Sequence, residues 1–202
     1  MDDPNAPAIP VPYISKLGDK LQPGQTLIAH GTIEPDASEF EVNLLNGSPH
    51  IESSDATIFH MKVNFKANRV VYNTYESGKW GTEEKSSIPF KKGDSFDLRI
   101  RIHEDKLEIF GNHKELHTYK ARISIDSAEY LALSGNVTLK GIHWGGRYYT
   151  LPFETQFSRE YLNADERVYL YGIPKGERFE VNFIARNGDI LFHFNPRLKE
   201  KK

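Results

Sequence analysis

The segment Phe59–Phe65 carries polar residues whose types and spacing suit the binding of a sugar. Its residues alternate between apolar and polar, so an extended strand would turn one set to a core and the other set to solvent. The polar set is His60, Lys62 and Asn64. Such side chains offer hydrogen-bond donors and acceptors at fixed positions, and sugar hydroxyls require both. The alternation therefore predicts a strand with one hydrogen-bonding face.

A turn at Ser77-Gly78 is expected to bring further groups to this face. Asn73 precedes the turn, and Trp80 and Glu83 follow it. If the strands on either side of the turn pair as neighbours, an indole and a carboxylate come within reach of the polar row. The weakly apolar C–H face of a galactose ring can lie flat against an indole. We therefore predict a sugar site that needs no cofactor and no metal.

These residues resemble the sugar-binding motifs of the galectin family. In that family, the histidine of an H-x-N-x-R strand, the asparagine of V-x-N, and the tryptophan and glutamate of W-G-x-E-x-R hold a β-galactoside. The resemblance implies that His60 contacts the axial galactose hydroxyl and that Trp80 stacks on the ring. It also implies that Asn73 and Glu83 hold other hydroxyls.

Three positions depart from these motifs. Lys62 stands where the family has asparagine, Asn64 where it has arginine, and Lys85 where it has the second arginine. Arginine offers a planar fork of donors and lysine a single ammonium, so these exchanges are not conservative. We expect weaker binding of plain lactose than the full motif would give, and a preference of the Lys62 ammonium for an anionic glycan such as a sulfated galactoside. The alternative is a galectin-fold interaction module that binds no sugar.

Composition excludes several other classes of function. The 202 residues include no cysteine, so neither disulfides nor thiolate metal sites are expected. The net charge of −2, from 26 basic and 28 acidic residues, argues against a nucleic-acid surface. No signal peptide or membrane-spanning segment is predicted, so we expect a cytoplasmic protein. The galectin resemblance adds export without a signal peptide, and with it an extracellular pool, as an alternative.

Short β-like runs bounded by turn residues recur along the chain and indicate an all-β, antiparallel sandwich or barrel. The resemblance implies a jelly-roll sandwich of the galectin or concanavalin-like kind. The runs are Leu27–Ile33, Phe40–Leu45, Ile58–Phe65, Arg69–Tyr75, Phe96–Ile102, Lys106–Phe110 and Tyr130–Val137.

An incomplete second copy follows this first domain. Phe40-Glu41-Val42-Asn43-Leu44 recurs as Phe179-Glu180-Val181-Asn182-Phe183. We predict an N-terminal tail at 1–11, a galectin-like domain at 12–149 and a partial second domain at 150–202, as in a nematode-type tandem-repeat galectin that stops inside its second domain. A shortened isoform, a partial gene model and an expression fragment would all give this sequence.

The second copy carries a partial sugar motif. His193, Asn195 and Arg197 match the family strand more fully than the first copy does, but the sequence holds no second asparagine and tryptophan motifs. We expect no working second site here. Because of its apolar rows and unpaired strand edges, we expect this segment to be flexible, docked on the first domain or paired with another copy of the chain.

Catalysis and metal binding are weaker readings of the chain. Glycoside hydrolysis uses two carboxylates, yet the adjacent Glu83 and Glu84 point to opposite faces of a strand. A hydrolase would need a second carboxylate, such as Glu76 or Asp55, from elsewhere. His113 and His117 have no carboxylate cluster beside them in the sequence, so we expect both to be solvated.

Overall fold

The computed structural model describes residues 8–146, 151–157, 168, 170, 174 and 176–199. By its internal contacts the chain divides into two units, Met1–Tyr161 and Leu162–Lys202, and each is described by itself. Residues 1–7 of the predicted tail and the predicted boundary between 149 and 150 lie outside the described residues. The predicted domain limits therefore stay predictions.

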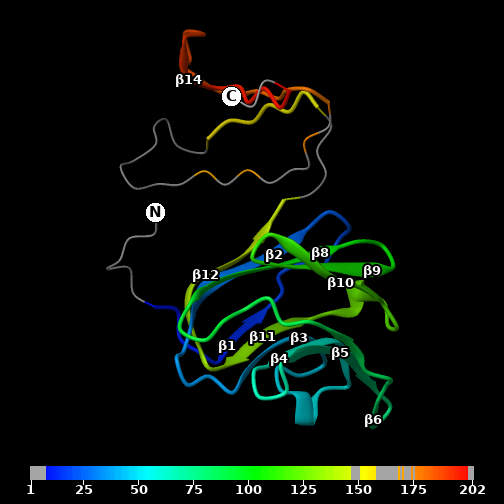
Figure 1. Ribbon diagram of the computed structural model, residues 1–202. Coiled ribbons are helices and arrows are strands. Elements are labelled where there is room, and N and C mark those ends of the chain that lie inside the picture. Colours follow the sequence, from blue (N-terminus) through cyan, green and yellow to red (C-terminus); the bar gives the residue numbers. More distant parts are fainter. Residues whose placement is uncertain are drawn as a thin grey trace. The chain divides into compact units, whose positions relative to one another are not determined.

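The first unit contains two antiparallel sheets, which form the two layers visible in Figure 1. The seven-stranded sheet has the order β1 (Tyr13–Lys16), β11 (Tyr130–Gly135), β3 (Glu39–Asn46), β4 (Ala56–Asn64), β5 (Arg69–Glu76) and β6 (Lys79–Trp80), and β7 (Glu84–Ser86) also pairs with β5. The five-stranded sheet has the order β10 (Lys114–Lys120), β9 (Lys106–Gly111), β8 (Ser95–Ile102), β2 (Thr26–Ile33) and β12 (Val137–Gly145).

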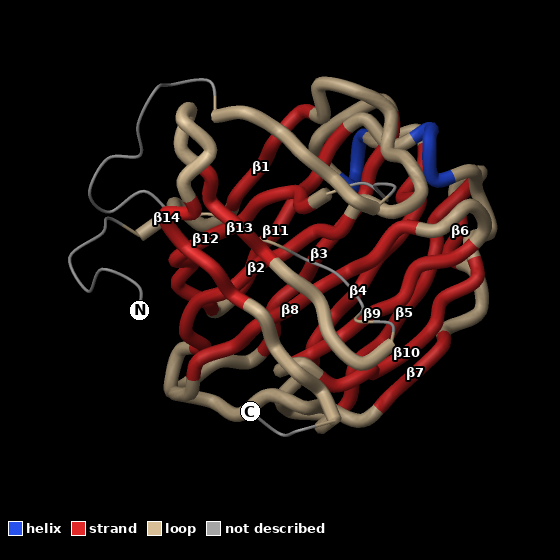
Figure 2. Tube along the Cα trace, turned by 90° about the horizontal axis from the view of Figure 1, so that it is seen from above, coloured by secondary structure: helices blue, strands red, loops and turns tan. Residues whose placement is uncertain are grey.

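Alternating residues of both sheets form one core between the layers. Phe40 on β3 lies at its centre, with ring centroids 5.5 Å from Phe96 and 5.7 Å from Phe90. On β8 the even-numbered apolar residues are all buried, as the alternation predicts. Helical residues in the described part are confined to two short 3-10 turns, Ile51–Ser53 and Ile125–Ser127, drawn blue in Figure 2. The all-β sandwich prediction is confirmed.

One predicted strand is wrong. The run Tyr130–Val137 is not a single strand: Tyr130–Gly135 belongs to the seven-stranded sheet, whereas Val137 begins β12 in the five-stranded sheet. Gly135 has a φ of +108°, a backbone conformation that residues with a side chain rarely adopt. The Asn136 side chain then accepts the backbone N–H of Ser38 at 3.0 Å. Together these features let the chain cross from one layer to the other.

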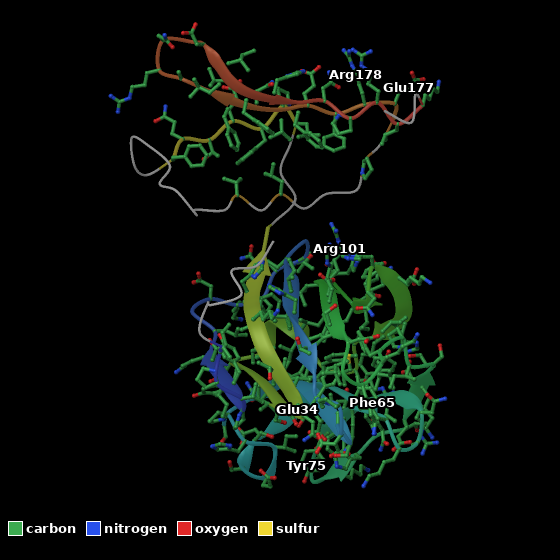
Figure 3. All side chains as sticks on the ribbon, turned by 60° about the vertical axis from the view of Figure 1, so that its left-hand side comes forward. Glu34, Phe65, Tyr75, Arg101, Glu177 and Arg178 are labelled. Carbon is green, nitrogen blue, oxygen red and sulfur yellow. The ribbon has the colours of Figure 1, made fainter. Side chains whose placement is uncertain are left out.

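The described part of the second unit contains a two-stranded sheet of β13 (Val181–Ile184) and β14 (Ile190–Phe194). Both strands carry apolar side chains that stay exposed within this hairpin. At the base of the hairpin, the backbones of Arg178 and Arg197 form an isolated antiparallel β-bridge. The side chains of Lys199 and Glu177 form an ion pair; Glu177 and Arg178 are labelled in Figure 3. No helix in the described stretches is both long and apolar enough to cross a membrane.

Candidate functional site

A cavity of about 340 Å³ lies over the seven-stranded sheet of the first unit. It is lined by side chains of β4, β5 and the segment from β6 towards β7. Its lining consists of His60, Lys62, Asn64, Arg69, Val71, Asn73, Trp80, Gly81 and Glu83. The structure therefore brings together six of the seven residues that the sequence predicts for the first site, and Lys85 is the one outside the lining.

Strand register explains why these residues converge. In the antiparallel pair β4–β5, His60 lies opposite Asn73 and Asn64 opposite Arg69. Directly opposed residues share one face of a sheet. The two-residue turn Ser77-Gly78, with φ values of +53° and +80°, has the left-handed geometry that closes tight hairpins. It places Trp80 opposite Tyr75 at the rim.

His60 is held in one orientation by a partner on β3. Its Nδ1 lies 2.6 Å from Asn43 Oδ1, and since an amide oxygen only accepts, Nδ1 donates and Nε2 is left as an acceptor. The side chain is buried, with 8% of the residue exposed. Burial lowers the pKa of His60 below its ordinary value of 6.5, and the Glu41 carboxylate partly opposes this effect. His60 is therefore neutral at pH 7.

Trp80 provides the apolar wall of the cavity. It is 42% exposed, although it is an aromatic residue in a sheet. Its ring centroid lies 4.9 Å from that of His60 and 5.3 Å from that of Tyr75; Tyr75 is labelled in Figure 3. The indole is thus fixed at its edges while part of its surface remains open to a ligand.

Lys62 is engaged by two carboxylates of β3. Its Nζ lies 2.8 Å from Glu39 Oε1 and 2.9 Å from Glu41 Oε1. Partial burial by itself would lower the pKa of Lys62, but the hydrogen bonds to Glu39 and Glu41 outweigh this effect and raise it. One ammonium thus faces two carboxylates. This arrangement removes the physical basis for the expected preference for sulfated glycans.

Glu83 and Glu84 have different surroundings, but not by the expected strand alternation, because the strand begins at Glu84 and Glu83 precedes it. Glu83 lines the cavity and pairs with Lys85 at 2.9 Å; this hydrogen bond lowers the pKa of Glu83, so the carboxylate stays ionised. Lys85 therefore supports Glu83 from outside the lining. Neither Glu76 nor Asp55 belongs to the lining, which contains one carboxylate.

Arg69 is a lining residue that sequence reasoning missed. It lies directly across the β4–β5 pair from Asn64. Asn64 Oδ1 meanwhile accepts the backbone N–H of Ala67 at 2.8 Å and so stabilises the turn between the two strands. A guanidinium thus reaches the cavity from β5, although the expected motif position on β4 holds a turn-forming amide. The sequence signal that could have identified Arg69 is the short turn between β4 and β5, because it places Arg69 opposite Asn64.

The expectation for His117 is wrong. Its Nε2 lies 2.7 Å from Glu84 Oε2, and its ring stacks on Tyr72 with centroids 4.5 Å apart. His117 comes from β10 and Glu84 from β7, so the pair bridges the two sheets, which no local pattern could indicate. His113 by contrast is largely exposed. Among the described residues no group of three or more His, Asp or Glu side chains could hold a metal.

The predicted partial second site falls on and after β14. His193 lies opposite Asn182 on β13, with Nδ1 2.6 Å from Asn182 Oδ1. Asn195 Nδ2 donates to Glu180 Oε1 at 3.3 Å, and Arg197 lies beyond the strand, bridged to Arg178. His193 and Arg197 are exposed. These three residues do not line the cavity described above, and their role stays a prediction.

Sequence comparison places the chain among known lectins. The family model described as galactoside-binding lectin matches residues 12–144 and 152–202. A 32 kDa beta-galactoside-binding lectin of Haemonchus contortus is 41% identical over 194 residues, which cover 95% of this chain and 68% of that protein. The 32 kDa beta-galactoside-binding lectin of Caenorhabditis elegans is also 41% identical, over 95% of this chain and 69% of that protein.

Solved structures show the same fold. Galectin LEC-6 of Caenorhabditis elegans superposes with a TM-score of 0.62 at 19% identity, over 69% of this chain and 94% of that chain. Sheep galectin-11, solved in complex with glycerol, gives a TM-score of 0.61 at 22% identity, over 67% and 98% of the two chains. The chain thus belongs to the galectin family, whose members are carbohydrate-binding lectins and not enzymes.

Proposed function

We propose that this chain binds β-galactosides, as parts of glycoproteins or glycolipids, in the cavity over β4, β5 and β6. The observation that carries the proposal is the joining of a part-exposed indole, Trp80, with His60, Asn73 and Glu83 around one cavity of about 340 Å³. Flat apolar surface beside fixed polar groups suits a sugar ring. The matching family model and the names of the two nematode relatives support the same ligand class.

The polar groups offer different chemistry to the hydroxyls. His60 presents the acceptor Nε2, because Asn43 holds its Nδ1 as donor. Glu83 is ionised and accepts only, whereas Asn73 presents an N–H of its Nδ2. The axial 4-hydroxyl of galactose would donate to His60, and the ring would stack on Trp80. Sugar stereochemistry at this one carbon should therefore decide binding.

Titration calorimetry on the full chain with lactose and with cellobiose tests this proposal. The two disaccharides differ in the orientation of the terminal 4-hydroxyl, so lactose should bind and cellobiose should not. Equal affinities would contradict the role given to His60.

A sugar-silent interaction module is the second candidate. The observation that favours it is the enclosure of Lys62 by Glu39 and Glu41, which leaves that side chain fewer donors for a ligand. Absence of heat with lactose, together with no retention on lactose-agarose, would support this candidate over the lectin.

A further inference from the structure

Arg122 reaches the carbohydrate site from the chain that follows β10. Its guanidinium donates to Asn73 Oδ1 at 3.0 Å, to the Thr82 carbonyl at 2.7 Å and to Glu84 Oε1 at 2.8 Å. It also lies 5.1 Å from the ring centroid of Tyr119, within the range of a cation–π contact. Arg122 is not a lining residue, yet its partners belong to β5, to β7 and to the segment between β6 and β7.

The first consequence concerns the Asn73 amide. Its Oδ1 accepts from Arg122 and from the backbone N–H of Thr74, whereas its Nδ2 donates to the Gly81 carbonyl at 3.0 Å. The opposite orientation would turn an NH₂ group towards two donors and an oxygen towards a carbonyl. The donor-only guanidinium therefore selects the orientation in which Asn73 offers an N–H to a ligand. Because only 4% of Asn73 is exposed, its amide has little room to take the opposite orientation.

The second consequence concerns the segment between β6 and β7. Thr82 accepts from Arg122, and Gly81 donates its N–H to Thr74 O at 2.9 Å. A Cβ on Gly81 would lie 2.6 Å from the Arg122 Nη1 and 3.2 Å from Asn73 Oδ1. Glycine at this position thus leaves the space that the guanidinium occupies. The segment between β6 and β7, which these hydrogen bonds hold in place, carries Trp80 at one end and Glu83 near the other.

The guanidinium is itself held in place. Glu84 accepts from Arg122 through Oε1 and pairs with His117 through Oε2. The hydrogen bonds from Arg122 and His117 outweigh the effect of burial and lower the pKa of Glu84. The Arg122 side chain is 29% exposed, so its ion pair is only partly screened by solvent.

We propose that Arg122 is a positioning residue of the carbohydrate site, which orients the Asn73 amide and ties the Gly81–Glu83 segment to β5. This inference rests on the proposed function, because it assigns a role in sugar affinity to a residue that touches no sugar. Arg122 acts mainly through Asn73, so the two residues should be coupled energetically.

A double-mutant cycle measures that coupling. Arg122→Met should weaken lactose binding about tenfold or more, because a charge-assisted hydrogen bond to a buried amide is lost. In the Asn73→Ala background, the same change should cost less than about threefold, since residues that act together are not additive. Arg101→Met is the matched control, because Arg101 lies on β8 of the five-stranded sheet (Figure 3); its lactose affinity should equal that of the parent chain.

Two further measurements keep the test decisive. Arg122→Lys keeps the charge without the planar fork and should give a smaller loss than Arg122→Met. Without any sugar, the side-chain NH₂ resonances of Asn73 in a ¹⁵N correlation spectrum should shift in Arg122→Lys and not in Arg101→Met.

Specific outcomes would overturn the proposal. A lactose affinity of Arg122→Met within twofold of the parent chain would contradict it. Independent effects would also contradict it, that is, if the loss of affinity in the double variant equalled the product of the losses in Arg122→Met and in Asn73→Ala. If the parent chain binds no lactose, the proposed function fails, and the unliganded Asn73 resonances still decide whether Arg122 orients that amide.

Discussion

The β3–β4 hairpin of the first unit and the β13–β14 hairpin of the second share one local design. In each, a histidine on the second strand lies opposite an asparagine on the first, and the Nδ1–Oδ1 distance is 2.6 Å in both. A glutamate two residues before the asparagine also accepts in both, from Lys62 in one and from Asn195 in the other.

The two hairpins differ in what surrounds them. In the first unit, β5, β6 and β7 continue the sheet beyond β4 and add Asn73, Trp80 and Glu83, so His60 is buried and a cavity forms. In the described part of the second unit the sheet has two strands, and His193 is exposed. The second hairpin carries the fuller motif, yet the first has the cavity. A motif orients a histidine, whereas neighbouring strands make a binding site.

The largest expected contrast is in stability. Phe40 and Phe179 are repeat equivalents, but Phe40 is 0% exposed and Phe179 is 40% exposed. Phe40→Ala should lower the free energy of unfolding of the first unit by about 3–5 kcal/mol through loss of buried area and a residual cavity. Phe179→Ala should change that transition by less than about 0.5 kcal/mol. Denaturant unfolding of the full chain measures both, and similar effects of the two changes would contradict the contrast.

Loss of the indole should give the next largest effect. Trp80→Ala should weaken lactose binding by about 1–3 kcal/mol, if stacking of a nucleic-acid base on an aromatic ring is a fair analogue. Arg197→Ala in the second hairpin should leave the affinity unchanged. Calorimetry on both variants checks this, and the reverse result would make the second hairpin the functional site.

Lactose affinity and stability should both fall on mild acidification. Burial lowers the pKa of His60 below 6.5, so below pH 6.5 the unfolded chain takes up a proton that the folded chain resists, and stability decreases as pH falls. Protonation also converts Nε2 from an acceptor to a donor. Lactose titrations and thermal unfolding between about pH 7.5 and 5 should show both losses. His60→Gln should flatten them within this window; a profile flattened instead by His193→Ala would refute the assignment.

A single change that gives the first hairpin the asparagine of the second should have a smaller effect on lactose affinity. Lys62→Asn restores a side chain that both donates and accepts, and the pairing of Asn195 with Glu180 suggests that Glu41 can still be satisfied. Lactose affinity should rise, by less than about tenfold or 1.4 kcal/mol. A fall in affinity would show that the Lys62 pairs with Glu39 and Glu41 support the site.

A related exchange tests the guanidinium of β5. In the double variant Asn64→Arg, Arg69→Asn, the guanidinium moves across the strand pair while remaining at the cavity. The double variant should bind lactose more tightly than Arg69→Asn alone, and equal affinities would show that the cavity makes no use of this group.

Local pattern was sufficient for part of the site. The alternation of Phe59–Phe65 predicts which side chains of β4 face the core, and Ser77-Gly78 predicts the turn that presents Trp80. Both follow from contacts between near neighbours in the chain. The pairs Lys62–Glu39 and Glu84–His117 were not predictable, because they join strands whose register depends on the whole sandwich.

The sequence by itself determined most of the strands, the tight turns, the repeat and the residue types of the candidate site, since these depend on alternation and on backbone preferences within a few residues. Tertiary structure decided that Lys62 is paired with Glu39 and Glu41, that Arg69 lines the cavity and that Arg122 is hydrogen-bonded to Asn73. The physical reason is that hydrogen bonds and ion pairs between distant segments act over a few ångströms, and only the packed sheets bring those groups so close.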